Sequence, residues 1–433
     1  APVSLPAFGF RSLSGSGEWV RETEDGQSES FETPFYRVAL DRQTQRIISL
    51  FDKHLQRELI RSQDAFGLGE CVYVHAEDKH RLPVTYEIPR RRGIKLLRGP
   101  LATEVVLESF EEQINANIRV VFTFEENSAA IGAHLSFENA TGLMGDYYDR
   151  YKKNLFFAFP FAMEDHHFLT ELACGAVDER RQRLRVNPRD FVMSAGYVAV
   201  ENGQHGIGLF CRELPLYHLG GIHYNEISAQ TDYGVSSSIF LYAASNRTNN
   251  LNYCEPGDCR GDFHLSILPY AGSGRTVLPP WADALRQPPL MGGPQAEAER
   301  SLMAIDAPNI RLSCLKRAED GEHVFLRLQE TEGLSAQGAV ILPFPLRSAF
   351  PADNVEEPVG GETAVKGRRL PFACGPYDTL NFLLTPAAEL PTAEEPPFTG
   401  VRNVFAMPVE NRDTLVCFEK APPRGTAYAI CSG

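Results

Sequence analysis

The chain has 433 residues, a formal net charge of −14 and 43% hydrophobic residues. The negative charge argues against nucleic acid and anionic membranes as partners, because both need a basic face on the protein. The length suggests about two to four domains, each with enough apolar residues for a core. Nine scattered cysteines, without a CxxC pair or an HExxH motif, are typical of reduced, buried thiols, so we expect a cytoplasmic protein.

Taken in chain order, residues 1–35 are expected to form a leading segment, and a series of short strands follows. In the first strand Tyr36, Val38 and Leu40 alternate with polar or smaller residues, which is the two-residue period of a half-buried strand. Further runs rich in β-branched and aromatic residues are found at 66–74, 102–110, 118–125 and 129–137. Strands at such short intervals, without long amphipathic helices between them, indicate an all-β sandwich.

The most apolar run is KKNLFFAFPFAM, residues 152–163. Its length and aromatic content favour a strand that is buried on both faces, and therefore central in a sheet. Pro160 cannot donate a ladder hydrogen bond, so we expect a bulge or the end of the strand there. More strands are predicted at 197–200, 206–211, 237–243 and 262–270, which completes a large β domain over residues 36–272.

Residues 273–300 are rich in Pro and Gly around one short helix candidate, Trp281–Arg286, and are predicted to be a linker. A second, smaller β-sandwich is predicted for residues 301–390. Its strands are expected at 309–315, 323–330, 338–344 and 379–384. Residues 391–433 form a predicted C-terminal β tail with two more strands.

Two polar motifs are candidates for a functional site. His166 and His167 in EDHHF lie next to acidic residues, but neighbours on a strand point to opposite faces, so a solvated strand end is favoured over a shared metal ion. The stretch SNRTNNLNY (245–253) combines amides, Arg and Tyr, which suit sugar hydroxyls, and a turn-rich loop is an equally good interpretation. Carboxylate pairs for glycoside chemistry cannot be chosen from sequence, because the deciding quantity is a distance in space.

Several segments together carry a family resemblance. FYRVALDRQTQRIISLFDKHLQREL (35–59) resembles the opening of the large β domain of glycoside hydrolase family 38 α-mannosidases, with Gln45 where the family often has Gly. FGLGECVYV (66–74) resembles a family motif in which Asn and Gln stand at the positions of Gly69 and Glu70. Residues 149–161, 190–210 and 301–333 resemble later segments in the same order. LPAFGFRSL (5–13) and GPYDTLNFLL (375–384) resemble the entry and the closing segment of the same region, so the resemblance extends from residue 5 to about 385. The tail resembles the first strands of a fibronectin type III module.

The resemblance implies a galactose-mutarotase-like super-sandwich followed by a smaller β-sandwich. In this family an Asp nucleophile, an acid/base carboxylate and a zinc ion lie in an N-terminal catalytic barrel, whose motifs we do not find here. The chain thus resembles the C-terminal β region only, with no catalytic residue and no metal of its own, and zinc is expected in the parent's catalytic domain. The expected partners are mannosides and that domain, and a homo-oligomer stays open. The residues expected at the rim of the sugar site are Asn246, Asn249, Asn252 and Tyr253.

Two other functions stay open. The chain could be a stand-alone carbohydrate-binding or scaffold protein, which would show an exposed aromatic platform. It could also be an aldose-epimerase-like sugar enzyme, because related folds host different chemistries. An epimerase would need a histidine and a carboxylate that converge in the concavity of the sandwich, and His223 and His264 are the histidines to test there.

Overall fold

The computed structural model describes residues 9–11, 23–24, 26, 28–77, 85–143, 151–173, 175–182, 191–223, 236–248, 251–252, 259–286 and 299–388. The chain divides into two compact units, Ala1–Ala387 and Ala388–Gly433. The strands predicted for the tail, and its resemblance to a fibronectin module, lie outside the described residues. Within the described ranges, no helix has the length and apolar character needed to cross a membrane.

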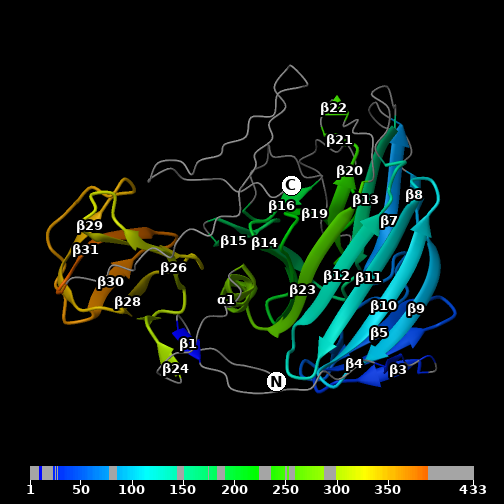
Figure 1. Ribbon diagram of the computed structural model, residues 1–433, viewed down its shortest axis with the longest axis horizontal. Coiled ribbons are helices and arrows are strands. Elements are labelled where there is room, and N and C mark those ends of the chain that lie inside the picture. Colours follow the sequence, from blue (N-terminus) through cyan, green and yellow to red (C-terminus); the bar gives the residue numbers. More distant parts are fainter. Residues whose placement is uncertain are drawn as a thin grey trace, which may run out of the picture. The chain divides into compact units, whose positions relative to one another are not determined.

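A ten-stranded antiparallel sheet forms one layer of the large domain (Figure 1). Its strands, in spatial order, are β15 (Gly175–Asp178), β14 (His167–Leu172), β17 (Tyr197–Glu201), β18 (His205–Cys211), β23 (Gly261–Ala271), β12 (Ile131–Glu138), β11 (Ala116–Glu125), β10 (Ala102–Glu111), β9 (Arg90–Arg98) and β2 (Thr23–Glu24). All of these strands pair antiparallel with their neighbours, which suits the short connections predicted from the sequence.

A six-stranded sheet and a four-stranded sheet complete the large domain. The six-stranded sheet contains β16 (Val192–Met193), β19 (Leu216–Leu219), β20 (Ile239–Ser245), β13 (Tyr151–Phe159), β7 (Glu70–Glu77) and β8 (Thr85–Glu87). The four-stranded sheet contains β3 (Ser30–Glu32), β4 (Tyr36–Asp41), β5 (Arg46–Asp52) and β6 (Arg57–Glu58). Two small ribbons pair β21 (Arg247–Thr248) with β22 (Leu251–Asn252), and β1 (Gly9–Arg11) with β24 (Glu299–Ser301).

The apolar run predicted to be central is strand β13, which lies between β20 and β7. Leu155, Phe157 and Phe159 enter the main core, which also receives side chains from the ten-stranded and four-stranded sheets. Phe156 and Ala158 point to the other face and enter a second apolar cluster. Burial on both faces is confirmed, and β13 ends immediately before Pro160, as expected from the missing N–H group.

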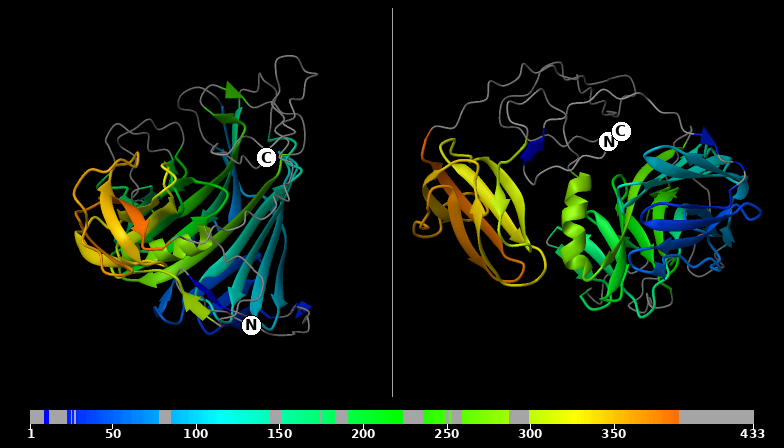
Figure 2. Two further views of the ribbon diagram at one scale, coloured as in Figure 1. Left: turned by 60° about the vertical axis from the view of Figure 1, so that its left-hand side comes forward. Right: turned by 90° about the horizontal axis from the view of Figure 1, so that it is seen from below.

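Helix α1 (Gly274–Arg286) lies within residues 273–300, for which the sequence predicts a linker with one short helix. The helix is longer than the predicted 281–286, because Pro279 and Pro280 lie inside it instead of before it. Leu278 and Ala282 are fully buried against residues of β14, β17, β18 and β23. Residues 274–286 therefore pack on the large domain, and Figure 2 shows the helix beside the strands of that domain. The leading segment differs as well, because β3 within it pairs with β4.

The small sandwich has a three-stranded and a four-stranded sheet around its own core. The first contains β25 (Ala304–Ile305), β28 (Ala336–Ile341) and β30 (Arg369–Cys374). The second contains β26 (Ile310–Arg317), β27 (Val324–Glu330), β31 (Thr379–Pro386) and β29 (Leu346–Ala352). The all-β class, with a large sandwich followed by a smaller one, is confirmed.

Candidate functional site

The polar stretch 245–253 is only partly described. Asn246 is 2% exposed, and its side-chain Oδ1 accepts a hydrogen bond from the Lys153 N–H group at 2.8 Å. Its own N–H group donates to the Lys153 carbonyl at 3.1 Å, so Asn246 fastens the end of β20 to β13. A side chain this buried offers little surface to a sugar. Asn252 lies in β22, while Asn249 and Tyr253 fall outside the described residues, and the sugar-rim role of this stretch stays a prediction.

The two histidines of EDHHF have different partners. The Nε2 atom of His166 lies 2.9 Å from the Ser236 carbonyl oxygen, whereas the Nε2 atom of His167 lies 3.1 Å from Oε1 of Glu201. This divergence agrees with the prediction that the two rings do not share an ion. Both side chains are half-buried, so the expected solvated strand end is more enclosed than predicted.

Glu201, at the end of β17, is the centre of a buried polar cluster. Its Oε2 atom accepts hydrogen bonds from the Tyr270 hydroxyl at 2.7 Å and from the Gly274 N–H group at 2.7 Å. Burial by itself would raise the pKa of Glu201, but the hydrogen bonds from His167, Tyr270 and Gly274 outweigh it and hold the pKa below its ordinary value. The ionised carboxylate therefore lies at the N-terminus of α1, where the helix dipole favours a negative charge.

The two histidines considered for an epimerase are in different surroundings. The His223 N–H group donates to Nδ1 of His218 at 3.0 Å, beside the six-stranded sheet. His264, on β23 of the ten-stranded sheet, has Glu213 as its carboxylate partner, with Nδ1 3.2 Å from Oε1. The ring stacked on His264 is that of His134, with centroids 4.7 Å apart. The alternating pattern of its strand predicts that His134 faces outward. The sequence around His134 does not predict that it lies opposite His264, because that contact depends on the pairing of β12 with β23.

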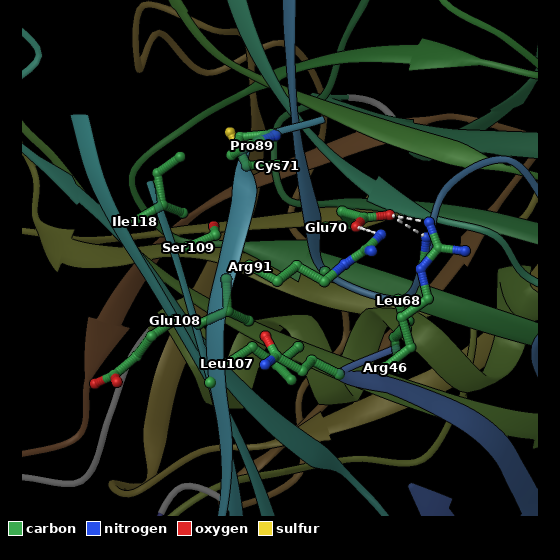
Figure 3. Close-up of a pocket in the computed structure, with 15 residues that line it drawn as sticks. Arg46, Leu68, Glu70, Cys71, Pro89, Arg91, Leu107, Glu108, Ser109 and Ile118 are labelled. Carbon is green, nitrogen blue, oxygen red and sulfur yellow. Dashed lines mark hydrogen bonds and ion pairs between the residues drawn. The ribbon is translucent and has the colours of Figure 1, made fainter. Parts of the chain in front are cut away.

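A small pocket lies where β5, β7, β9 and β10 approach one another (Figure 3). Glu70 forms ion pairs with two arginines there: Arg46 at 2.6 Å, and Arg91 in a still closer contact. The Oε1 atom of Gln45, on the pocket wall, is buried without a hydrogen-bond partner. Gln45 has a φ of 54°, in the left-handed region that favours glycine, which gives a physical reason for the Gly that the family often has at this position.

The size of this pocket limits what it can bind. Its cavity volume is about 30 Å³, which is room for one or two water molecules and far too little for a sugar ring. The carboxylate of Glu70 is engaged by both arginines and also accepts a hydrogen bond from the Gly67 N–H group at 2.7 Å. We therefore interpret this pocket as a structural contact between the four-stranded, six-stranded and ten-stranded sheets, without a ligand-binding role.

A network of charged side chains joins α1, the large sheet and the small sandwich. Glu171, which is 2% exposed, pairs with Arg286 of α1 and, at 3.2 Å, with Arg311 of β26. Arg311 also binds Asp283 of α1 at 2.7 Å. Because Glu171 is buried and has two cationic partners, loss of either arginine would leave charge poorly compensated at this junction.

These features define an all-β region in which a large super-sandwich is followed by a small sandwich. The ion pairs of Arg311 with Glu171 and Asp283 connect the two. Residues 309–386 match the family model described as the glycosyl hydrolases family 38 C-terminal beta sandwich domain. This match covers strands β26 to β31 and most of the second core. No curated protein matches the chain in sequence.

Solved structures show the same fold over most of the chain. An α-mannosidase from Enterococcus faecalis V583 covers 86% of this chain with 43% of its own length, at a TM-score of 0.56 and 12% identity. A protein of glycosyl hydrolase family 38 from Enterococcus faecalis covers 86% of this chain with 46% of its length, at a TM-score of 0.57 and 12% identity. A galactose mutarotase-like protein from Lactobacillus casei has a TM-score of 0.33, too low to support an inference about this chain.

The expected resemblance is therefore confirmed at two levels. The sequence of the small sandwich matches the family 38 domain, and the fold of the described chain is that of a glycoside hydrolase family 38-like β region. At 12% identity the likeness to the two solved structures shows the fold alone. The chain spans less than half the length of both relatives.

Proposed function

We propose that this chain is the C-terminal β region of a glycoside hydrolase that, as a full-length parent, hydrolyses terminal α-mannosides. The observation that carries the proposal is the joint likeness of both sandwiches: a family 38 domain match over 309–386 and a shared fold over 86% of the chain. The nucleophile, the acid/base carboxylate and the zinc ion would then belong to the parent's catalytic domain. This chain would bind and brace that domain and line part of the sugar site.

The bracing role is supported by the ion pairs that connect the parts of this region. The ion pairs of Glu171 with Arg286 and Arg311 tie α1 and the small sandwich to the large sheet. A candidate contact surface for the catalytic domain is apolar: Leu172 and Met193 are 41% and 62% exposed, although large apolar side chains are normally buried. Leu172 and Met193 lie near each other, because their chain neighbours Glu171 and Ser194 are in contact: the Ser194 hydroxyl donates to the Glu171 carbonyl at 3.3 Å.

A second candidate function is favoured by one observation. His264, on β23 of the ten-stranded sheet, has its Nδ1 atom 3.2 Å from Oε1 of Glu213, and an aldose-epimerase-like enzyme would need such a histidine–carboxylate pair. His223 contacts other groups, so an epimerase site would use His134 beside His264 instead. Mutarotation of an aldose, followed by polarimetry with the chain and with a Glu213→Ala variant, tests this alternative. Faster mutarotation that Glu213→Ala abolishes would favour it over the scaffold role.

The direct test compares the full-length natural protein with this chain in hydrolysis of p-nitrophenyl-α-mannoside, with the β-mannoside as control. We expect hydrolysis of the α-anomer by the full-length protein, its loss on zinc chelation, and none by this chain. Turnover by this chain alone would overturn the assignment of catalysis to a separate domain. A full-length protein that is inactive but binds mannosides would favour the stand-alone carbohydrate-binding role.

A further inference from the structure

Two histidines and an aspartate from neighbouring strands meet on one face of the ten-stranded sheet. His134 of β12 and His264 of β23 are directly opposite in the antiparallel register, and Asp262 precedes His264 by two residues. One ligand atom from each of the three lies within 4.8 Å of the other two. The imidazole rings are stacked, with centroids 4.7 Å apart and planes inclined by 13°.

This cluster is accessible from solvent. Along β23, Phe263 and Leu265 enter the main core, so the alternating Asp262 and His264 point to the opposite face. The exposed fractions of the side chains are 37% for His134, 62% for His264 and 68% for Asp262. An ion could therefore enter without any rearrangement of the fold.

Glu213 orients one of the two rings. Its Oε2 atom accepts the backbone N–H of His264 at 2.7 Å, and its Oε1 atom lies 3.2 Å from Nδ1 of the same residue. With Nδ1 held by this carboxylate, the tautomer presents the lone pair of Nε2. A carboxylate behind a histidine is the arrangement that orients metal-binding imidazoles in proteins and makes them more basic.

We propose that His134, Asp262 and His264 bind a divalent transition-metal ion of the zinc class. Two imidazoles with one carboxylate suit Zn²⁺, Ni²⁺ or Cu²⁺, whereas Mg²⁺ and Ca²⁺ prefer all-oxygen sites. The Nε2 atom of His134 is already in close contact with Oδ1 of Asp262, and the ion would replace the proton between them. Together the carboxylates of Asp262 and Glu213 balance the two charges of the ion.

The geometry requires only a small adjustment. Ligand atoms around a tetrahedral zinc ion are about 3.3 Å apart, given bonds of about 2.0–2.1 Å, so the atoms now within 4.8 Å need a modest side-chain rotation. Three protein ligands leave a fourth position for water. The ion would also cross-link β12 and β23, which carry its ligands. We expected no metal in this chain from its sequence, because the chain resembles the β region without the zinc-binding catalytic domain. The sequence contains no signal for this cluster, since 128 residues separate His134 from Asp262.

The test is calorimetric titration of ZnCl₂ into the untagged, chelator-treated 433-residue chain, alongside single variants. We expect one zinc per chain and a higher melting temperature with zinc. His134→Gln and His264→Gln should weaken binding by about a hundredfold or more. Glu213→Ala, which removes the orienting carboxylate, should weaken binding about 10- to 100-fold.

The matched control is His323→Gln. His323 also pairs with an aspartate, Asp320, at 2.7 Å, and it is not part of the cluster. Zinc binding that is unchanged in His323→Gln and lost in the two cluster variants supports the site. Absence of binding, or equal affinity in all four variants, overturns it. Melting curves without zinc check that each variant folds, and these outcomes are independent of any test of mannoside hydrolysis.

Discussion

Replacement of Glu201 tests the packing of α1 against the large sheet, where the sequence predicted a linker. Glu201 is 4% exposed and accepts hydrogen bonds from the Tyr270 hydroxyl and the Gly274 N–H group, both at 2.7 Å. Glu201→Ala removes the acceptor of both bonds. Because Tyr270 and Gly274 are buried, water cannot readily replace it.

The magnitude follows from these contacts. Each buried donor left without a partner costs about 1–3 kcal/mol, so we expect Glu201→Ala to lower the free energy of unfolding by about 2–6 kcal/mol. Glu201→Gln keeps one acceptor oxygen for Tyr270 and Gly274, but it loses the charge and replaces the oxygen that faces His167 by an NH2 group. Its cost should be about 1–2 kcal/mol, from weaker hydrogen bonds and the lost interaction with the N-terminus of α1.

The pH dependence has a definite sign. The pKa of Glu201 is held below its ordinary value of 4.5 in the folded protein, because the hydrogen bonds to the carboxylate outweigh the effect of burial. The ionised group therefore contributes stability above about pH 4.5, and this contribution is lost as the pH falls through the folded-state pKa. The difference between wild type and Glu201→Gln should accordingly be largest near neutral pH and shrink in acid.

Urea unfolding followed by tryptophan fluorescence is the assay, because Trp281 lies in α1 and reports on its detachment. Glu125→Ala, at an exposed position on β11, is the control and should change stability by less than about 0.5 kcal/mol. If Glu201→Ala were as mild as Glu125→Ala, the account of α1 as a packed helix would be wrong.

Two further predictions concern contacts between parts of the fold: the close packing at Gly69 and the ion pair of Glu171 with Arg311. Gly69→Ala should lower the free energy of unfolding by about 1–3 kcal/mol, because the residue has a φ of 69° and a Cβ atom would lie 2.6 Å from the Phe122 ring. Gly203→Ala, with a φ of 83° and no atom within 4 Å, should show only the smaller backbone cost in the same urea unfolding experiment. A double-mutant cycle on Glu171 and Arg311 should give a coupling energy of about 1–3 kcal/mol, and a value near zero would refute the proposed link between the sandwiches.

The strands and the central element could be predicted because their signal is local. The run of aromatic residues around Phe157 needs burial on both sides, and β13 has it. The extent of α1 could not be predicted from the same reasoning. Pro279 and Pro280 lack N–H groups and normally stop a helix, but burial of Leu278 and Ala282 against the sheet compensates here.

The candidate sites were harder to predict, because they depend on which strands become neighbours. Asn246 was chosen for its polarity in a loop, yet it is buried and fastens two strands. His134 was not chosen at all, since nothing near it in sequence marks it. Its relation to His264 exists only in the register between β12 and β23. Side-chain chemistry can be read along a chain, whereas convergence across a sheet requires the structure.

The most direct test of the central proposal is the intact mass of the natural protein, measured by mass spectrometry on the form that carries α-mannosidase activity. This chain has a mass of 48.1 kDa, and 86% of it aligns with 43–46% of the length of the two family 38 relatives. The proposal that it is the β region of a larger hydrolase predicts an active polypeptide of about twice this mass. An active natural protein of 48.1 kDa would contradict it and direct attention to the sheet face around His264.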